Sequence, residues 1–152
     1  MTAQGDAVAR EARRWIGTPY VHQASAFGAG ADCLGLIRGI WRALYGNEPE
    51  KVPAYSMDWS EPQGEEQLWE AAMRHLRAKD LADAAVGDVL LFRMRAGAVA
   101  KHLGVQSATG SKAGFVHAYS KFGVIESPLS APWRRKIVAR FTYPETYPEE
   151  ID

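Results

Sequence analysis

Apolar residues in the first half of the chain recur at the spacing of an amphipathic helix. After Cys33 they occupy positions that fall on one helical face. These positions are Leu36, Ile37, Ile40, Trp41 and Leu44. Asp32 is a typical helix N-cap and Gly46 a typical C-terminal stop, so we expect a helix that begins at Cys33 and ends before Gly46.

The same periodicity predicts two further helices. The first spans residues 6–16 with Asp6 as its cap, and the second runs from Ser60 to about Arg77. Their predicted buried faces consist of Val8, Ala12, Trp15 and Ile16 in the first, and of Leu68, Ala72 and Leu76 in the second.

The second half of the chain changes to short β-rich segments separated by turn signals. Five segments are predicted to be strands: residues 89–94, 102–106, 115–119, 123–126 and 135–141. Helices followed by an antiparallel meander define an α+β domain. We therefore predict N-terminal helices, one of which carries the cysteine, packed on an antiparallel sheet of about five strands.

The length of 152 residues fits a single domain, residues 1–152, with a core of its own. Residues 47–62 hold three prolines and the aromatic residues Tyr55 and Trp59, and we interpret them as an ordered surface connection. A loop of this length in a compact domain is often functional. Residues 143–152 are rich in proline and acidic residues, so we expect a loose acidic tail.

Composition and charge exclude several classes of function. The chain has 18 basic and 18 acidic residues, which leaves no electrostatic basis for nucleic-acid binding. Its single cysteine excludes an intramolecular disulfide and a paired-cysteine zinc site, and no apolar run is long enough to span a membrane. The four histidines lack the close spacing of metal ligands, and we find no glycine-rich phosphate loop. We therefore expect neither a metal nor a cofactor.

Cys33 is the first candidate for chemistry. At the N-terminus of a helix, free backbone N–H groups and the helix dipole favour a thiolate, which is the nucleophilic form of cysteine. The alternative is a small buried apolar side chain, the usual role of a lone cysteine. A nucleophile also needs a base, so the rest of the chain must supply a histidine.

His102 and His117 are the best candidates for that base. They fall in adjacent predicted strands fifteen residues apart, and a hairpin would bring them side by side on one face of the sheet. One could then act as base and the other could orient it. The alternative is a pair of core histidines that bind backbone groups. His22 could line a cleft, whereas His75 in a charged helix is expected to be solvated.

Five segments, taken in order, resemble the NlpC-type (NlpC/P60 superfamily) papain-like cysteine peptidases of the cell wall. They are Trp15-Ile16-Gly17-Thr18-Pro19-Tyr20, Asp32-Cys33-Leu34-Gly35-Leu36, Val86-Gly87-Asp88-Val89-Leu90-Leu91-Phe92, His102-Leu103-Gly104-Val105 and Phe115-Val116-His117-Ala118. The resemblance covers most of the chain. The segment Pro132-Trp133-Arg134-Arg135 resembles the small members encoded by phages and gene transfer agents.

The resemblance implies a role for each matching residue. Cys33 would be the nucleophile, His102 the general base and His117 the residue that orients the base. Tyr20 matches a tyrosine that faces the nucleophile and would donate a hydrogen bond to the oxyanion or the substrate. Asp32 matches an acidic residue that helps to hold the free amino end of the stem peptide, although capping of the helix explains it equally well.

The implied reaction is hydrolysis of peptidoglycan stem peptides at the bond between γ-linked D-glutamate and a diamino acid. One departure affects specificity: Leu34 occupies the position of a serine that is usual in the family, and it offers no hydroxyl to a substrate amine. Two alternatives remain open. One is an amidase or acyltransferase that uses the same three residues, and the other is a structural tail-tip module that binds the wall with a silent site.

The expected partners are the stem peptide and phage-like tail proteins. The first residues of the chain contain no signal peptide. We therefore expect the protein to be made in the cytoplasm and delivered to the periplasm or cell wall as part of a phage-like particle.

Overall fold

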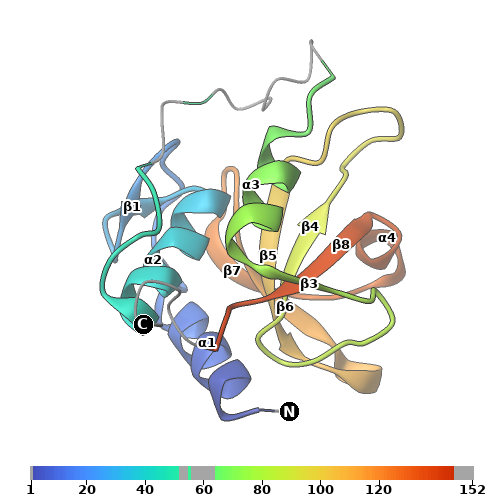
Figure 1. The fold of residues 1–152 in the computed structure, drawn as a ribbon, viewed down its shortest axis with the longest axis horizontal. Helices are drawn as coiled ribbons and strands as arrows, with labels where there is room; N and C mark the ends of the chain where they lie inside the picture. The colour runs from blue at the N-terminus through green and yellow to red at the C-terminus, as the bar shows by residue number, and fades with distance from the viewer. Residues whose placement is uncertain (1, 52–54, 56–63, 146–152) are drawn as a thin grey trace.

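The structure is a computed structural model that describes residues 2–51, 55 and 64–145. Its centre is a six-stranded antiparallel sheet in the order β3-β8-β4-β5-β6-β7. The strands are β3 (Arg77–Lys79), β4 (Val89–Phe92), β5 (His102–Ala108), β6 (Gly114–Tyr119), β7 (Gly123–Pro128) and β8 (Ile137–Thr142). Helices α1 (Ala3–Arg14) and α2 (Cys33–Tyr45) pack on one side of this sheet, and the short α4 (Ala131–Arg134) lies on the other (Figure 1). This arrangement confirms the predicted α+β class.

Helix α2 has the predicted bounds. The Asp32 carboxylate accepts a hydrogen bond from the Gly35 N–H at 2.7 Å, and this contact caps the first turn. At the other end Gly46 has a φ of 93°, which is a conformation that favours glycine and ends the helix. The helix therefore places Cys33 at its first position, as the sequence predicts.

The first helix begins earlier than predicted. Thr2 is its N-cap, with Oγ1 accepting from the Gly5 N–H at 2.9 Å, and Asp6 lies inside the first turn. Because α1 ends at Arg14, the helical spacing no longer applies to Ile16, which is 44% exposed instead of buried. Val8, Ala12 and Trp15 are buried as predicted.

The third helix, α3 (Gln67–His75), is shorter than predicted. Residues 60–63 lie outside the described part of the chain, and 64–66 are not helical. After His75 the chain becomes extended and forms β3, in which Arg77 pairs with Thr142 of β8. This three-residue edge strand carries mostly exposed side chains, so no alternation of apolar residues signals it.

All five predicted strands are present as β4 to β8. The structure adds β3 and a separate two-stranded hairpin, β1 (Ser25–Ala26) with β2 (Gly30–Ala31), directly before Asp32. Backbone pairing alone defines such short strands, and their residues carry no β pattern. The hairpin leads the chain into the start of α2.

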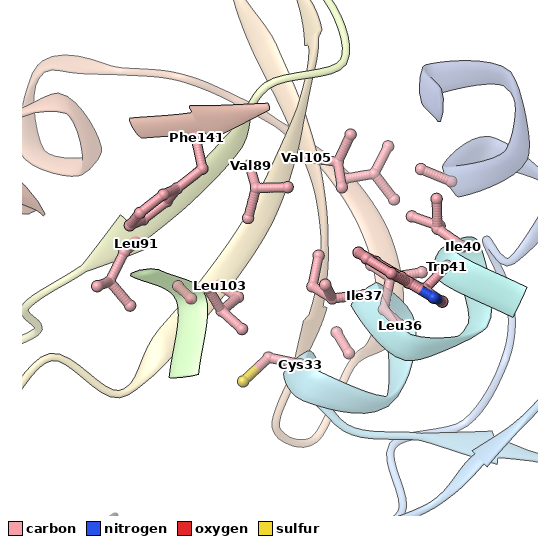
Figure 2. Close-up of a cluster of buried hydrophobic side chains, with 14 of the residues drawn as sticks. Cys33, Leu36, Ile37, Ile40, Trp41, Val89, Leu91, Leu103, Val105 and Phe141 are labelled. Carbon is pink, nitrogen blue, oxygen red and sulfur yellow. The ribbon is translucent and has the colours of Figure 1, made fainter. Parts of the chain in front are cut away.

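Alternation along the strands builds a separate apolar cluster on each face of the sheet. The larger one lies between the helices and the sheet and includes Leu36, Ile40, Trp41, Val89, Leu103, Val105 and Phe141 (Figure 2). The smaller one, on the opposite face, consists of Leu90, Phe92, Ala113, Phe115 and Leu129. Full burial of one such large side chain contributes about 1.5–3 kcal/mol, so both faces stabilise the sheet.

The start of the predicted loose tail is held firmly in place. Tyr143 is 2% exposed, and its hydroxyl donates to the Ile37 carbonyl at 2.8 Å. The Gln4 side-chain amide donates to the carbonyls of Tyr143 and Pro144 at 2.9 and 3.0 Å. The prediction is thus wrong for residues 143 and 144, because their partners lie on α1 and α2. Residues 146–152 lie outside the described part of the chain.

Candidate active site

Four of the five predicted site residues line one pocket of about 160 Å³: Tyr20, Asp32, Cys33 and His102. The remaining lining residues are His22, Tyr55, Met94, Lys101, Ala118, Tyr119 and Ser120. Cys33 is 7% exposed, and its sulfur lies 3.8 Å from the carbonyl oxygen of Lys101, the residue before His102. Figure 2 shows this sulfur at the edge of the larger apolar cluster. The N-terminus of α2 and the beginning of β5 therefore meet at this pocket.

The fifth predicted residue, His117, binds His102 directly. His102 Nε2 lies 2.8 Å from His117 Nδ1, and His117 Nε2 lies 2.9 Å from the hydroxyl oxygen of Ser127. These two contacts link three neighbouring strands, from β5 through β6 to β7. Because His102 uses Nε2 for this contact, its Nδ1 is left for the pocket that it shares with Cys33.

The absence of a side chain at Gly104 makes room for the Phe115 ring, which packs against His117. A Cβ atom at this position would come within 2.8 Å of the Phe115 ring and within 3.4 Å of the His117 Cβ. Any larger residue would therefore push against the Phe115 ring, whose centroid lies 4.1 Å from that of His117. Gly104 lies two residues after His102 on β5, so both positions face the same side of the sheet.

Both imidazoles lie on the face of the sheet opposite to α1 and α2. Leu103 belongs to the larger cluster between helices and sheet, so its neighbour His102 points to the other face. The ring centroids of His102 and Phe92 are 5.6 Å apart, and those of His117 and Phe115 are 4.1 Å apart. His102 still lines the pocket that holds Cys33 because it is the first residue of β5, where the sheet ends.

Burial keeps both histidines neutral. Loss of solvation, and next the neighbouring His117, lower the pKa of His102 to about 3. Loss of solvation also lowers the pKa of His117 to about 4. When Nε2–H of His102 donates to His117 and Nε2–H of His117 donates to Ser127, the Nδ1 of His102 carries a free lone pair. In this tautomer His102 can accept a proton.

The thiol of Cys33 is also neutral at rest, which corrects the expectation of a thiolate. Burial, and next the charge of Asp32, raise the pKa of Cys33 to about 12. Hydrogen bonds from the backbone N–H groups of Leu103, Leu34 and Cys33 itself lower this pKa, as expected at a helix N-terminus, but burial outweighs them. The proton must therefore leave the sulfur during the reaction itself.

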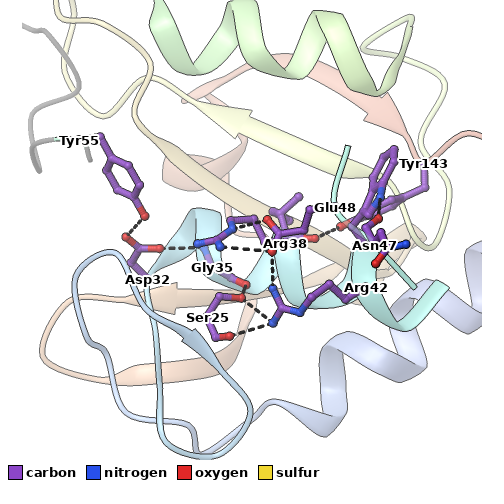
Figure 3. Close-up of polar contacts among 11 residues, drawn as sticks. Ser25, Asp32, Gly35, Arg38, Arg42, Asn47, Glu48, Tyr55 and Tyr143 are labelled. Carbon is purple, nitrogen blue, oxygen red and sulfur yellow. Dashed lines mark hydrogen bonds and ion pairs between the residues drawn. The ribbon is translucent and has the colours of Figure 1, made fainter. Parts of the chain in front are cut away.

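Asp32 has several partners besides its capping contact. One of its oxygens accepts from the Gln23 N–H at 2.7 Å. The same oxygen accepts from the Tyr55 hydroxyl, as Figure 3 shows. The His22 Nδ1 lies 3.7 Å from the same oxygen. Although only 3% of its side chain is exposed, Asp32 still lines the pocket. It combines a structural role with a negative charge at the site.

Two arginines of α2 fix the chain on either side of this helix. Arg38 and Arg42 both bind the Glu48 carboxylate, at 2.6 and 2.9 Å (Figure 3). Arg42 also donates to the carbonyl and the hydroxyl of Ser25 at 2.8 and 2.9 Å. These contacts connect the β1 hairpin and the segment after α2 to the helix that carries Cys33.

Tyr20 lies at the pocket because its backbone forms a parallel bridge with Ala31, two residues before Cys33. Burial, together with the nearby Cys33 and Asp32, raises the pKa of Tyr20 to about 12. The phenol therefore keeps its proton at neutral pH and can donate a hydrogen bond into the pocket.

Sequence reasoning missed Ser127 and the part that Tyr55 plays at Asp32. Ser127 has no local signal, since the pairing of β6 with β7 alone places it beside His117. His75, expected to be solvated, instead binds Glu50. Of residues 47–62, only 47–51 and Tyr55 are described.

No protein-family model and no curated protein matches the chain. Among solved structures, a lipoprotein-like NLP/P60 family protein from Staphylococcus aureus subsp. aureus Mu50 has a TM-score of 0.61 and 18% identity, covering 96% of this chain and 43% of its own. An NlpC/P60 family protein from Bacillus cereus ATCC 10987 has a TM-score of 0.62 and 19% identity, covering 94% and 41%.

The NlpC/p60 domain of the peptidoglycan hydrolase SagA has a TM-score of 0.59 and 22% identity, covering 91% of this chain and 97% of the domain. The chain thus spans less than half of the two bacterial proteins but nearly all of this domain. A helix that begins with cysteine and faces a histidine-bearing antiparallel sheet defines a papain-like α+β domain. More specifically, the chain has the NlpC/P60 fold.

Within the described residues, no group of three or more histidine, cysteine, aspartate or glutamate side chains is placed to hold a metal ion. No helix in the same part of the chain is long and apolar enough to cross a membrane.

The two buried histidines make stability depend on pH. An unfolded imidazole takes up its proton near pH 6.5, whereas the folded pKa values are about 3 and about 4, so the unfolded chain binds more protons in between. We expect the free energy of unfolding to fall as the pH decreases from 6.5 to 4, by up to about 1.4 kcal/mol per pH unit for each imidazole.

Urea denaturation at several pH values measures this slope. It should be shallower in the variant His102→Gln/His117→Gln than in the wild type. Equal slopes in the double variant and the wild type would contradict the assignment.

Proposed function

We propose that the protein is a cysteine endopeptidase that hydrolyses peptidoglycan stem peptides between γ-linked D-glutamate and the following diamino acid. The observation that supports it is the chain of contacts from the pocket shared by Cys33 and His102 to His117, 2.8 Å from His102. The fold, which is also that of the NlpC/p60 domain of a peptidoglycan hydrolase, fits this proposal.

In the first step the Cys33 sulfur attacks the peptide carbonyl carbon while its proton passes to His102 Nδ1. His117 accepts the hydrogen bond from Nε2 of His102 and holds the imidazolium that forms in its orientation. The negative charge on the carbonyl oxygen is stabilised by the backbone N–H of Cys33 at the helix start and by the Tyr20 hydroxyl.

In the second half of the reaction His102 gives its proton to the leaving amine, and a thioester on Cys33 remains. A water molecule then loses a proton to His102 and attacks the thioester carbon, the C–S bond breaks to release the carboxyl product, and the proton returns from His102 to the sulfur, which restores the thiol. An amine in place of this water would give an acyl transfer, so the two outcomes differ only in the second nucleophile.

Substrate orientation depends on charge at the pocket. The Asp32 carboxylate, held by Tyr55 and the Gln23 N–H, offers a negative charge to the free amino end of a stem peptide. Leu34 adds an apolar, half-buried side chain next to the nucleophile instead of a hydroxyl. The amine is therefore bound by charge, with no help from a serine at position 34.

Mass spectrometry of purified stem peptides after incubation with the reduced protein tests the proposal, with a heat-denatured sample as control. We expect two products that correspond to cleavage after γ-D-glutamate. Addition of hydroxylamine distinguishes the alternatives, since an acyltransferase would convert most of the substrate to the hydroxamate. Intact peptides after incubation with folded protein would contradict the proposal and favour a wall-binding module with a silent site.

Delivery of the protein to the cell wall within a phage-like particle stays a prediction of the sequence, based on the segment 132–135. Immunodetection in purified particles would test it, and absence of the protein from them would contradict it.

Ser127 should contribute to the rate through His117. In Ser127→Ala the His117 Nε2 loses its partner at 2.9 Å, which weakens the preference for the tautomer that leaves His102 Nδ1 unprotonated. A hydrogen bond of about 1 kcal/mol corresponds to an expected fall in kcat of about fivefold, with little change in KM. Ser130→Ala, which alters a nearby exposed serine without a side-chain capping contact, is the matched control. Identical kcat values in all three proteins would rule out this role.

A further inference from the structure

The indole of Trp133 lies against both histidines of the site. Its ring centroid is 5.7 Å from that of His102 and 5.2 Å from that of His117. The plane of His117 meets it edge-on at 79°, whereas His102 is tilted by 33°. Further ring contacts, between 5.1 and 5.6 Å, join the indole to Phe92, Phe115 and Tyr119. One side chain thus touches aromatic residues of β4, β5 and β6.

The position of this indole is fixed from both ends of α4. The Leu129 side chain is 4% exposed in the smaller apolar cluster, and its N–H donates to the Ala113 carbonyl at 2.9 Å. Arg134 donates from Nε to the Leu129 carbonyl at 2.9 Å, and the Trp133 carbonyl accepts from the Lys136 N–H at 3.0 Å. The half-buried indole is therefore anchored against the sheet face that α1 and α2 leave uncovered.

We propose that Trp133 is a positioning residue of the active site: its indole holds the ring planes of His102 and His117 and excludes water from the face of the pair opposite to α2. This inference rests on the proposed function for its effect on rate. Its effect on the two imidazoles is independent of any turnover.

Exclusion of water decides which protonation state the histidines adopt. A charged imidazolium loses solvation on this face, so the neutral pair is favoured, in agreement with the pKa of about 3 for His102 and about 4 for His117. The polar and titratable groups that share the pocket or contact the pair are Tyr20, His22, Asp32, Cys33, Tyr55, Lys101, Tyr119, Ser120 and Ser127. On α4 itself, Arg134 is exposed and points its Nε to a backbone carbonyl.

Removal of the indole should admit water to the imidazoles. In Trp133→Ala we expect the pKa values of His102 and His117 to rise by about one unit or more towards the value of a solvated histidine. Trp133→Phe keeps an aromatic ring and should shift them less. Trp69→Ala removes another half-buried tryptophan, which lies on α3 and has the Arg93 guanidinium over its ring at 5.8 Å, and it should cause no shift.

Titration of the imidazoles of His102 and His117 by NMR is the test. In the wild type both site histidines should stay largely neutral at pH 5, whereas in Trp133→Ala His117 should be partly protonated at this pH and both imidazoles should titrate at higher pH than in the wild type. Circular dichroism checks folding, and if the alanine variant is unfolded, Trp133→Phe and Trp133→Leu decide the outcome. Unchanged titration in the folded variants would overturn the proposal.

The rate measurement then tests the link to catalysis. If the stem peptide is hydrolysed, the acidic limb of kcat/KM should move to higher pH in Trp133→Ala, with a fall in kcat and an unchanged KM. If the wild type does not hydrolyse it, the proposed function fails while the NMR titration still tests the role of Trp133. A fall in kcat equal to that of Trp69→Ala, without a change in pH profile, would show a merely structural role.

Discussion

Cys33→Ala should abolish hydrolysis, with a fall in kcat of at least about 10⁴-fold. The chain has no other thiol, and the attack requires a polarisable nucleophile at the start of α2 beside His102. Without the sulfur no thioester forms, and the remaining groups of the pocket can only bind the peptide. The rate of product formation, measured by mass spectrometry under reducing conditions, is the readout.

The fold should survive this change. The sulfur is 7% exposed, and its polar contact to the Lys101 carbonyl is long, at 3.8 Å, so its loss should alter the free energy of unfolding by no more than about 1 kcal/mol. Cys33→Ser fills the same space with a weaker nucleophile and should also be inactive. Turnover in Cys33→Ala above a hundredth of the wild-type rate would exclude Cys33 as the nucleophile.

Arg140→Met should lower the free energy of unfolding by about 3–5 kcal/mol, because it leaves the buried carboxylate of Asp88 without its main partner. Arg140 is 5% exposed and Asp88 1%, and Arg140 Nη1 lies 2.7 Å from the Asp88 carboxylate. Nη1 also contacts Gln106 at 2.6 Å, and Nε donates to the Leu81 carbonyl at 3.0 Å. Lys79, at 3.1 Å from Asp88, compensates only part of the loss. Urea denaturation measures the change.

A matched control separates this buried pair from an ordinary surface pair. Arg74→Met breaks an exposed contact with Glu50 and should cost less than about 1 kcal/mol. Because Asp88 and Arg140 interact directly, the double variant Asp88→Ala/Arg140→Met should lose less free energy of unfolding than the two single variants lose together. Strictly additive losses, or an Arg140→Met loss equal to that of Arg74→Met, would refute the argument.

Patterns of nearby residues correctly predicted the helix α2 and the strands β4 to β8. Asp32 and Gly46 end α2 through contacts within a few residues of themselves, and apolar runs marked β4 to β8. Predictions failed where a partner lies far along the chain. Tyr143 looked like part of a loose tail, yet it is buried because its hydroxyl reaches Ile37 more than a hundred residues away.

The candidate site divides in the same way. The sequence by itself placed Cys33 at a helix start and put His102 and His117 on adjacent strands, since periodicity and capping residues encode both. Only the tertiary structure added Ser127 and Trp133, because their contacts with the histidines arise from strand register and from the return of α4 onto the sheet.

The protonation state of the site was likewise decided by packing. The helix N-terminus predicted a thiolate, but burial of Cys33 beside Asp32 raises its pKa, and burial lowers the pKa values of both imidazoles. Solvation is a property of the whole fold and cannot be read from neighbours along the chain. The sequence thus determined which groups are present and on which elements they lie, and the tertiary structure determined their contacts and their charge.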